Sequence, residues 1–202
     1  PRLLGSFTEL GGYSYPHSFV QLPGGRLLAT FQGRGPDNIP PGGLVELDRE
    51  GRFIRATSAR SESFDSLQMR PYSLAVLPDI DRVVSTSTDM LADYGAHLQI
   101  WRLSDLSLLQ TIALPTTSDG DGHTHDAPAR SKGEAHHLFP GEPRALADGR
   151  MVLLATFTCG FYRVTGIDGP SPRVEFLQAF GGENCAVPVL VGWAAVQNNV
   201  AW

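Results

Sequence analysis

The sequence is poor in cysteine, in charge and in long apolar runs, and each shortage excludes a class of protein. Two cysteines in 202 residues are too few for a scaffold that is held together by disulfides. Charged residues make up 18% of the chain, and no basic cluster accompanies its net charge of −5, so a nucleic-acid partner is not expected. No apolar run approaches the roughly 18 residues of a membrane helix, so no membrane span is expected either.

Helical periodicity is scarce as well, whereas turn residues are abundant, with 22 Gly and 15 Pro. The apolar residues instead alternate with polar ones in short segments, which is typical of strands. One pattern recurs three times, at 22–31, 77–86 and 146–157: an apolar residue, a tight turn, an Arg, and a β-rich run with a Thr near its end. The Gly-Gly and Asp-Gly turns of the first and third copies favour hairpins.

A second predicted hairpin follows each copy, at 43–56, 97–112 and 160–177. Four antiparallel strands per unit form the blade of a β-propeller. We therefore expect an all-β protein with units at roughly 13–60, 70–115, 136–180 and 185–202. About three and a half blades cannot close a ring, so we expect the chain to be part of a longer one. The alternative is a small β-sandwich with irregular loops, against which the repeat argues.

An arginine occupies the same place in each copy of the repeat, as Arg26, Arg82 and Arg150. Recurrence in every unit favours a packing role, such as an ion pair at a strand end, over catalysis.

Five of the six histidines fall near predicted strand starts or in the long polar segment 116–141, whereas His97 lies within a strand and is interpreted as structural. Loops that enter the inner strands of a propeller meet at one end of its channel, where residues distant in sequence can bind one metal ion. Imidazole suits copper, iron and zinc, with Cu(II) favoured on affinity. Asp126 and Glu142 are candidate ligands, or acceptors of hydrogen bonds that fix the tautomers of the histidines. The alternative is that these side chains are merely solvated. The candidate ligands are His17, His123, His125, His136 and His137.

The two cysteines, Cys159 and Cys185, allow two interpretations. They either form one disulfide, which neighbouring blades would bring within reach, or remain two buried thiols. A disulfide would favour a periplasmic or secreted location over the cytoplasm.

Two stretches of the chain carry a resemblance to a known family. In the first, from Asp81 to Ile112, Tyr94-Gly95-Ala96-His97-Leu98 precedes an aromatic Ile100-Trp101 strand. This segment resembles the selenium-binding-protein (methanethiol oxidase-like) family. The second, from Glu142 to Val164, contains Thr156-Phe157-Thr158-Cys159-Gly160 and is similar to a bacterial branch of related propellers.

The resemblance implies a seven-bladed propeller with histidines around a metal, with copper as the implied cofactor, at one end of the channel. It also implies an oxidoreductase that acts on a small thiol with oxygen as acceptor. The selenium-binding cysteine motif of the animal members is not visible in this sequence, so selenium binding is not expected. The rival hypothesis is a non-catalytic propeller scaffold that binds a protein or small-molecule partner, because one fold hosts many functions.

Overall fold

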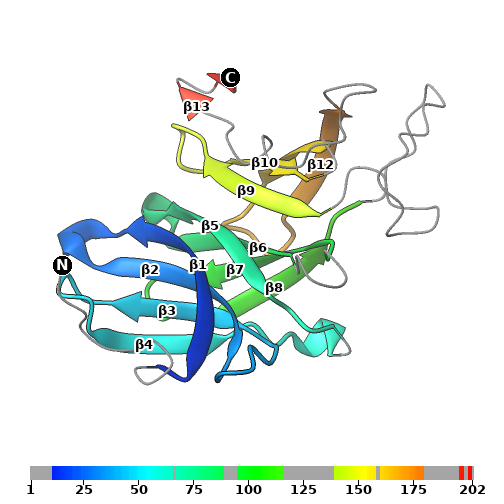
Figure 1. The fold of residues 1–202 in the computed structure, drawn as a ribbon. Coiled ribbons are helices and arrows are strands. Elements are labelled where there is room, and N and C mark those ends of the chain that lie inside the picture. The colour runs from blue at the N-terminus through cyan, green and yellow to red at the C-terminus, as the bar shows by residue number, and fades with distance from the viewer. Residues whose placement is uncertain are drawn as a thin grey trace.

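The computed structural model describes residues 11–65, 67–88, 95–115, 139–157, 160–179, 196–197 and 200–201. Its strands form three four-stranded antiparallel sheets and one two-stranded hairpin (Figure 1). Within each large sheet the strands are neighbours in the order in which they occur in the chain. This meander, repeated three times, gives the chain a propeller-like organisation.

The sheets correspond to three successive stretches of sequence. The first contains β1 (Tyr13–Gln21), β2 (Leu27–Arg34), β3 (Gly43–Leu47) and β4 (Phe53–Ser58). The second contains β5 (Pro71–Leu77), β6 (Arg82–Ser87), β7 (His97–Arg102) and β8 (Leu108–Ala113). The third contains β9 (Pro140–Ala145), β10 (Val152–Thr156), β11 (Gly160–Thr165) and β12 (Arg173–Ala179). The small hairpin is β13 (Val196–Gln197) with β14 (Val200–Ala201).

Short turns with the expected residues connect the strands. The β1–β2 turn is the 3-10 element η1 (Pro23–Gly25), and Gly24 and Gly25 have φ of 79° and 81° there, a conformation that glycine adopts without steric cost. In the β3–β4 turn, the carboxylate of Asp48 accepts hydrogen bonds from the backbone N–H groups of Glu50 and Arg52, at 2.9 and 2.8 Å. The remaining 3-10 elements are η2 (Glu62–Phe64) and η3 (Pro78–Ile80).

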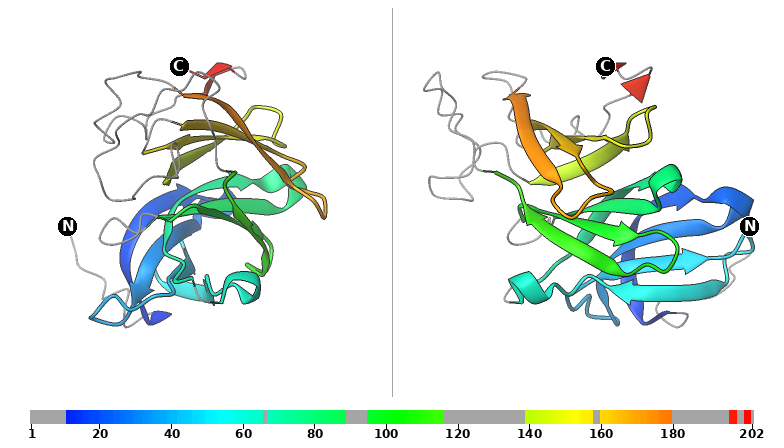
Figure 2. Two further views of the ribbon diagram at one scale, coloured as in Figure 1. Left: turned by 90° about the vertical axis from the view of Figure 1, so that its right-hand side faces the viewer. Right: turned by 180° about the vertical axis from the view of Figure 1, so that it is seen from behind.

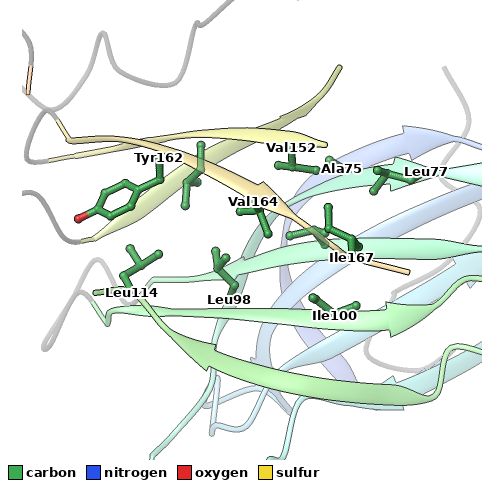
Figure 3. Close-up of a cluster of buried hydrophobic side chains, with 11 residues drawn as sticks. Ala75, Leu77, Leu98, Ile100, Leu114, Val152, Tyr162, Val164 and Ile167 are labelled. Carbon is green, nitrogen blue, oxygen red and sulfur yellow. The ribbon is translucent and has the colours of Figure 1, made fainter. Parts of the chain in front are cut away.

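Apolar side chains fill the two spaces between the three sheets, which lie side by side in two further views (Figure 2). Between the first and second sheets, Leu28 and Leu44 pack with the fully buried Trp101. Between the second and third sheets, Leu98 and Ile100 face Val164 and other residues of the third sheet (Figure 3). Each sheet is therefore apolar on the face that it turns toward its neighbour, which explains the alternating pattern of the sequence.

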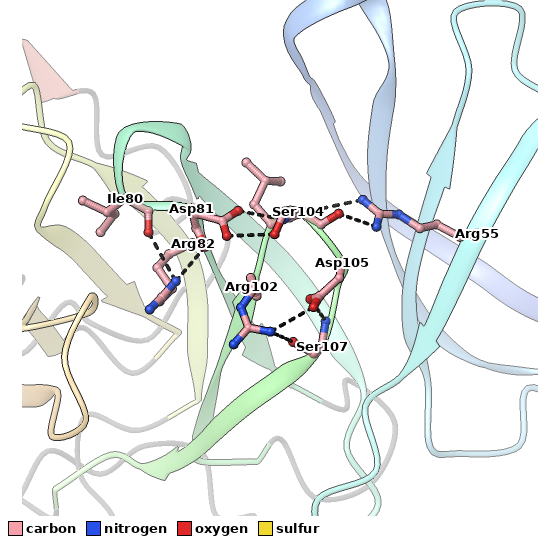
Figure 4. Close-up of polar contacts among 9 residues, drawn as sticks. Arg55, Ile80, Asp81, Arg82, Arg102, Ser104, Asp105 and Ser107 are labelled. Carbon is pink, nitrogen blue, oxygen red and sulfur yellow. Dashed lines mark hydrogen bonds and ion pairs between the residues drawn. The ribbon is translucent and has the colours of Figure 1, made fainter.

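Arginines tie the sheets together at the end where β1 turns into β2. Arg55 of β4 donates hydrogen bonds to the carbonyl oxygens of Ser104 and Leu103 in the second sheet, at 2.6 and 3.2 Å (Figure 4). Arg82 of β6 similarly donates to the carbonyl oxygens of Ile167, at 3.2 Å, and Asp168, at 3.3 Å, in the third sheet. Side chains on one sheet thus cap the outer turn of the next sheet.

The repeated arginines have the packing role that their recurrence predicts. Arg26 pairs with the buried Glu46, and Arg150 pairs with Asp168 at 2.7 Å. Both pairs lie within one sheet and join a strand start to the neighbouring strand or turn. Arg82, the third of the set, instead binds backbone carbonyl groups.

Candidate functional site

Two of the predicted site residues lie in the described part of the chain, and both lie on inner strands. His17 lies within β1, not ahead of the first inner strand as predicted, because β1 already begins at Tyr13. Glu142 lies in β9. The other candidates fall outside the described residues: His123, His125, Asp126, His136, His137, Cys159 and Cys185.

The innermost strands β1, β5 and β9 share an irregularity that brings His17 and Glu142 to equivalent places. Each strand contains a proline, Pro16, Pro71 or Pro140, and the strand pairing shifts register immediately after it. Such bulges reorient side chains locally. The residues one and two places after each proline therefore form two rows across the three sheets, with β5 between β1 and β9.

The first row is aromatic. The imidazole of His17 stacks on the ring of Tyr72, with centroids 3.6 Å apart and planes inclined by 32°. In the third sheet the equivalent position is Gly141, which carries no ring. There the ring of Tyr72 meets Phe157 instead in a T-shaped arrangement, with centroids 5.4 Å apart and an interplanar angle of 79°. Three rings from three sheets thus form one continuous aromatic row.

The second row is polar and hydrogen-bonded from end to end. The hydroxyl of Ser73 donates to Oε2 of Glu142 at 2.6 Å. Because that bond uses the only proton of the Ser73 hydroxyl, Ser18 must donate the hydrogen bond of 3.0 Å that joins its Oγ to that of Ser73. Arg144 donates to the same carboxylate oxygen of Glu142 at 3.0 Å. The carboxylate is therefore anchored through Oε2.

We call the surface formed by His17, Tyr72, Phe157 and Glu142, with Ser18 beside it, the inner-strand face. His17 lies at the surface there with its ring partly covered by the stack on Tyr72, and Tyr72 is half-buried. Partial burial lowers the pKa of His17, while the charge of Glu142 and a hydrogen bond involving the backbone of Tyr72 oppose that shift. Burial, and then the charge of Glu142, raise the pKa of Tyr72. At neutral pH the face therefore presents a neutral imidazole, a neutral phenol and one anchored carboxylate.

Neutral imidazole and carboxylate oxygen are both metal ligands. Within the described ranges, however, no three His, Cys, Asp or Glu residues gather closely enough to hold a metal ion. His17 and Glu142 thus fit part of a copper site, and the rest of its ligands would have to come from the chain beyond these ranges. His97, by contrast, lies in β7 and packs on Phe64, with centroids 4.9 Å apart, which agrees with the structural role predicted for it.

Tyr72 and Ser18 belong to the face, and the buried Ser73 donates a hydrogen bond to Glu142 there, but none of the three is among the predicted site residues. The sequence signal for them is Pro-His-Ser at 16–18 and Pro-Tyr-Ser at 71–73. Each begins six residues before the first residue of a repeat copy, Leu22 or Leu77. The third copy, Pro-Gly-Glu at 140–142, differs at both positions after the proline.

No family model and no curated protein matches the chain, but solved structures match its fold. A candidate 6-phosphogluconolactonase from Bacteroides uniformis is 16% identical, with a TM-score of 0.51 over 81% of this chain and 44% of that one. The β-propeller domain of Cps50 (Swd1) from Myceliophteria thermophila is 15% identical, with a TM-score of 0.43 over 83% of this chain and 39% of that one. The chain thus spans less than half the length of these structures.

At 16% identity, the similarity to the bacterial structure extends to the fold alone. It agrees with the all-β organisation of repeated four-stranded antiparallel sheets. The resemblance to selenium-binding proteins, and the ring of seven blades that it implies, stay predictions. In the described ranges no helix is long and apolar enough to cross a membrane.

Proposed function

We propose that the chain contributes part of a seven-bladed propeller that binds copper at the inner-strand face and oxidises a small thiol with oxygen. The observation that carries the proposal is the position of His17: its imidazole, kept neutral by partial burial, lies at this face near the Glu142 carboxylate. A neutral imidazole is the form that binds a metal.

The connectivity of the chain supports further ligands at the same end of the sheets. Only Leu138 and Phe139 separate His137 from Pro140, where β9 begins. Pro140 is the counterpart of Pro16, the residue immediately before His17. The proposal therefore takes His136 and His137, which precede Pro140 by only a few residues, as the further ligands.

Glu142 has a different place in the proposed site. Its Oε2 is bound by Ser73 and Arg144, whereas its Oε1 accepts no hydrogen bond from the described residues. The carboxylate would bind the metal through Oε1, or accept a hydrogen bond from the N–H of a ligand imidazole and so fix its tautomer. When bound, copper would supply the one-electron chemistry that thiol oxidation by oxygen requires, and the chain's own groups would orient the thiol and take up its proton.

The proposal is tested by measuring copper in the full-length protein, purified without a histidine tag, by elemental analysis. We expect about one copper per chain at the proposed site and a loss of affinity of at least about tenfold in His17→Ala, since the remaining ligands cannot complete the geometry. His97→Gln is the matched control, because His97 packs on Phe64 in β7 and should leave the metal content unchanged.

If the purified protein takes up no copper, or if His17→Ala and His97→Gln bind it equally well, the proposal is wrong. The non-catalytic scaffold then becomes the better interpretation. One observation already favours it as the second candidate: both hydrogen bonds to Glu142 come from side chains of the protein itself, as in a purely structural network.

A further inference from the structure

A threonine hydroxyl links adjacent inner strands at two equivalent places. Thr30 of β2 accepts a hydrogen bond from the backbone N–H of Ser18 at 3.0 Å and donates one to the carbonyl oxygen of Tyr72 at 2.8 Å. Its side chain thereby joins the inner strand of its own sheet to the inner strand of the next. We call this arrangement a threonine tie.

The second tie repeats the first in the neighbouring pair of sheets. Thr86 of β6 accepts from the backbone N–H of Ser73 at 3.1 Å and donates to the carbonyl oxygen of Gly141 at 2.8 Å. Both threonines are fully buried, so water cannot replace these bonds. In the third sheet the position one residue before the partner of Pro140 is Ala155, which has no hydroxyl to donate.

The two ties act on the residues that form the inner-strand face. Thr30 donates a hydrogen bond to the backbone of Tyr72, and the ring of Tyr72 stacks with the imidazole of His17. Thr86 holds the backbone of Gly141, the neighbour of Glu142. Because a buried hydroxyl bonded on both sides permits little movement of the strands, each tie fixes the distance between two elements of the face.

We infer that Thr30 and Thr86 are positioning residues, which act through Tyr72 and Gly141 to hold His17 and Glu142 in the arrangement that the proposed site requires. The inference deepens the proposed function, since it concerns the same face. It is nevertheless tested without metal and survives if copper does not bind.

Valine in place of either threonine keeps the shape but removes the hydroxyl, so the buried backbone N–H of Ser18 or Ser73 loses its acceptor. The strands must then separate enough to admit water or another partner. In Thr30→Val the first and second sheets separate, so the Tyr72 ring moves away from the imidazole of His17. In Thr86→Val the second and third sheets separate, so the Tyr72 ring moves away from Phe157.

The experiment measures, by NMR in the metal-free full-length protein at one pH, the nuclear Overhauser effects between the rings of His17 and Tyr72 and between those of Tyr72 and Phe157. We expect Thr30→Val to weaken the His17–Tyr72 effect, because that tie joins the first and second sheets. Thr86→Val should instead weaken the Tyr72–Phe157 effect, because that tie joins the second and third sheets. Thr30→Ser, which retains the hydroxyl, should restore the wild-type ring contacts.

A merely structural role would not weaken a different ring contact in each of two folded variants. Thr111→Val is the matched control: Thr111 lies on the outer strand β8 and accepts a hydrogen bond from Gln99 at 3.2 Å, so both ring contacts should be unchanged. Wild-type ring contacts in Thr30→Val and Thr86→Val would overturn the inference. Should Thr30→Val fail to fold, Thr86→Val decides it alone, because each tie controls its own pair of rings.

Discussion

The imidazole of His17 lies on the ring of Tyr72 at a centroid separation of 3.6 Å, although the two residues belong to different sheets. The contact exists because β1 and β5 present the residue after an equivalent proline to the same side. The pKa of His17 therefore depends on how closely the first and second sheets approach each other. A protonated imidazole would lose hydration in this stack, so the folded protein prefers the neutral form.

This preference predicts a pH dependence of stability. Because the pKa of His17 is lower in the folded protein than its ordinary 6.5, the unfolded chain binds more protons between the two values. The free energy of unfolding should therefore fall as the pH is lowered through about 6.5, and level off below the folded pKa. Urea unfolding between pH 5 and about 8 measures the slope, and His17→Gln should make it shallower.

The other described histidine provides the comparison. Burial also lowers the pKa of His97, so His97→Gln should reduce the same slope through a site on a different strand. The double variant should flatten the slope further, since the two histidines share no described partner. A His17→Gln protein with the full wild-type slope would show that the stack on Tyr72 does not discriminate between the two forms of the imidazole.

Strand order and hairpin turns could be predicted from the sequence, because they depend on local patterns. Alternation of apolar residues and the turn at Gly24-Gly25 specify a hairpin within about ten residues of chain. The repeated Arg26 and Arg150 likewise indicated ion pairs, which the structure shows. The long-range features of the face depend instead on how one sheet meets the next, and no local pattern encodes that.

Thr30 and Glu46 illustrate this limit. The sequence predicts Thr30 only as part of a β-rich run, yet it joins two sheets because the bulge after Pro16 turns the backbone N–H of Ser18 toward it. Glu46 is the one charged residue of β3, and a charged side chain in a strand is expected to face solvent, yet it is fully buried. Arginines from β4 and from the start of β2 reach it, which the sequence of β3 alone does not reveal.

Glu142 should also control the ionisation of Tyr72. Burial is the main cause of the raised pKa of Tyr72, and the negative charge of Glu142 adds to it. Glu142→Gln removes the charge and keeps the size, so the pKa of Tyr72 should fall while staying above 10.0. Difference absorbance of the phenolate in wild type, Glu142→Gln and Tyr72→Phe isolates this tyrosine. Identical Tyr72 titrations in wild type and Glu142→Gln would contradict the proximity of the two side chains.

The indole of Trp101 tests the core between the first and second sheets. Trp101 is fully buried, and its Nε1–H donates to Oγ of Ser85 at 2.9 Å. Ser85→Ala leaves this donor unpaired in an apolar environment, which should cost about 1–3 kcal/mol of unfolding free energy. Trp101→Phe in the Ser85→Ala background removes the unpaired donor, so the two substitutions should not add in a double-mutant cycle. Strict additivity would mean that the hydrogen bond does not contribute.

Glu46 is the buried centre of an ion-pair network, and its removal should be the most damaging polar substitution in the first sheet. Its carboxylate pairs with Arg26 and also with Arg55, which lies 2.6 Å away. Arg55 in turn caps the β7–β8 turn of the second sheet, so the network joins two sheets. Glu46→Gln should lower the unfolding free energy by about 2–3 kcal/mol, toward the lower end for a broken buried pair because both arginines can reach water.

The matched control for Glu46 is Glu50, which also contacts two arginines, Arg49 at 2.6 Å and Arg52 at 3.0 Å, but on the surface of the β3–β4 turn. Exposed ion pairs contribute little because water and salt screen both charges. Glu50→Gln should therefore change stability by less than about 0.5 kcal/mol, and urea unfolding of both variants at one pH measures the contrast. Equal effects at the two positions would mean that burial of Glu46 adds nothing to its pairs. A large loss at Glu46 alone would show that the first two sheets are held together by a buried carboxylate as well as by their apolar faces.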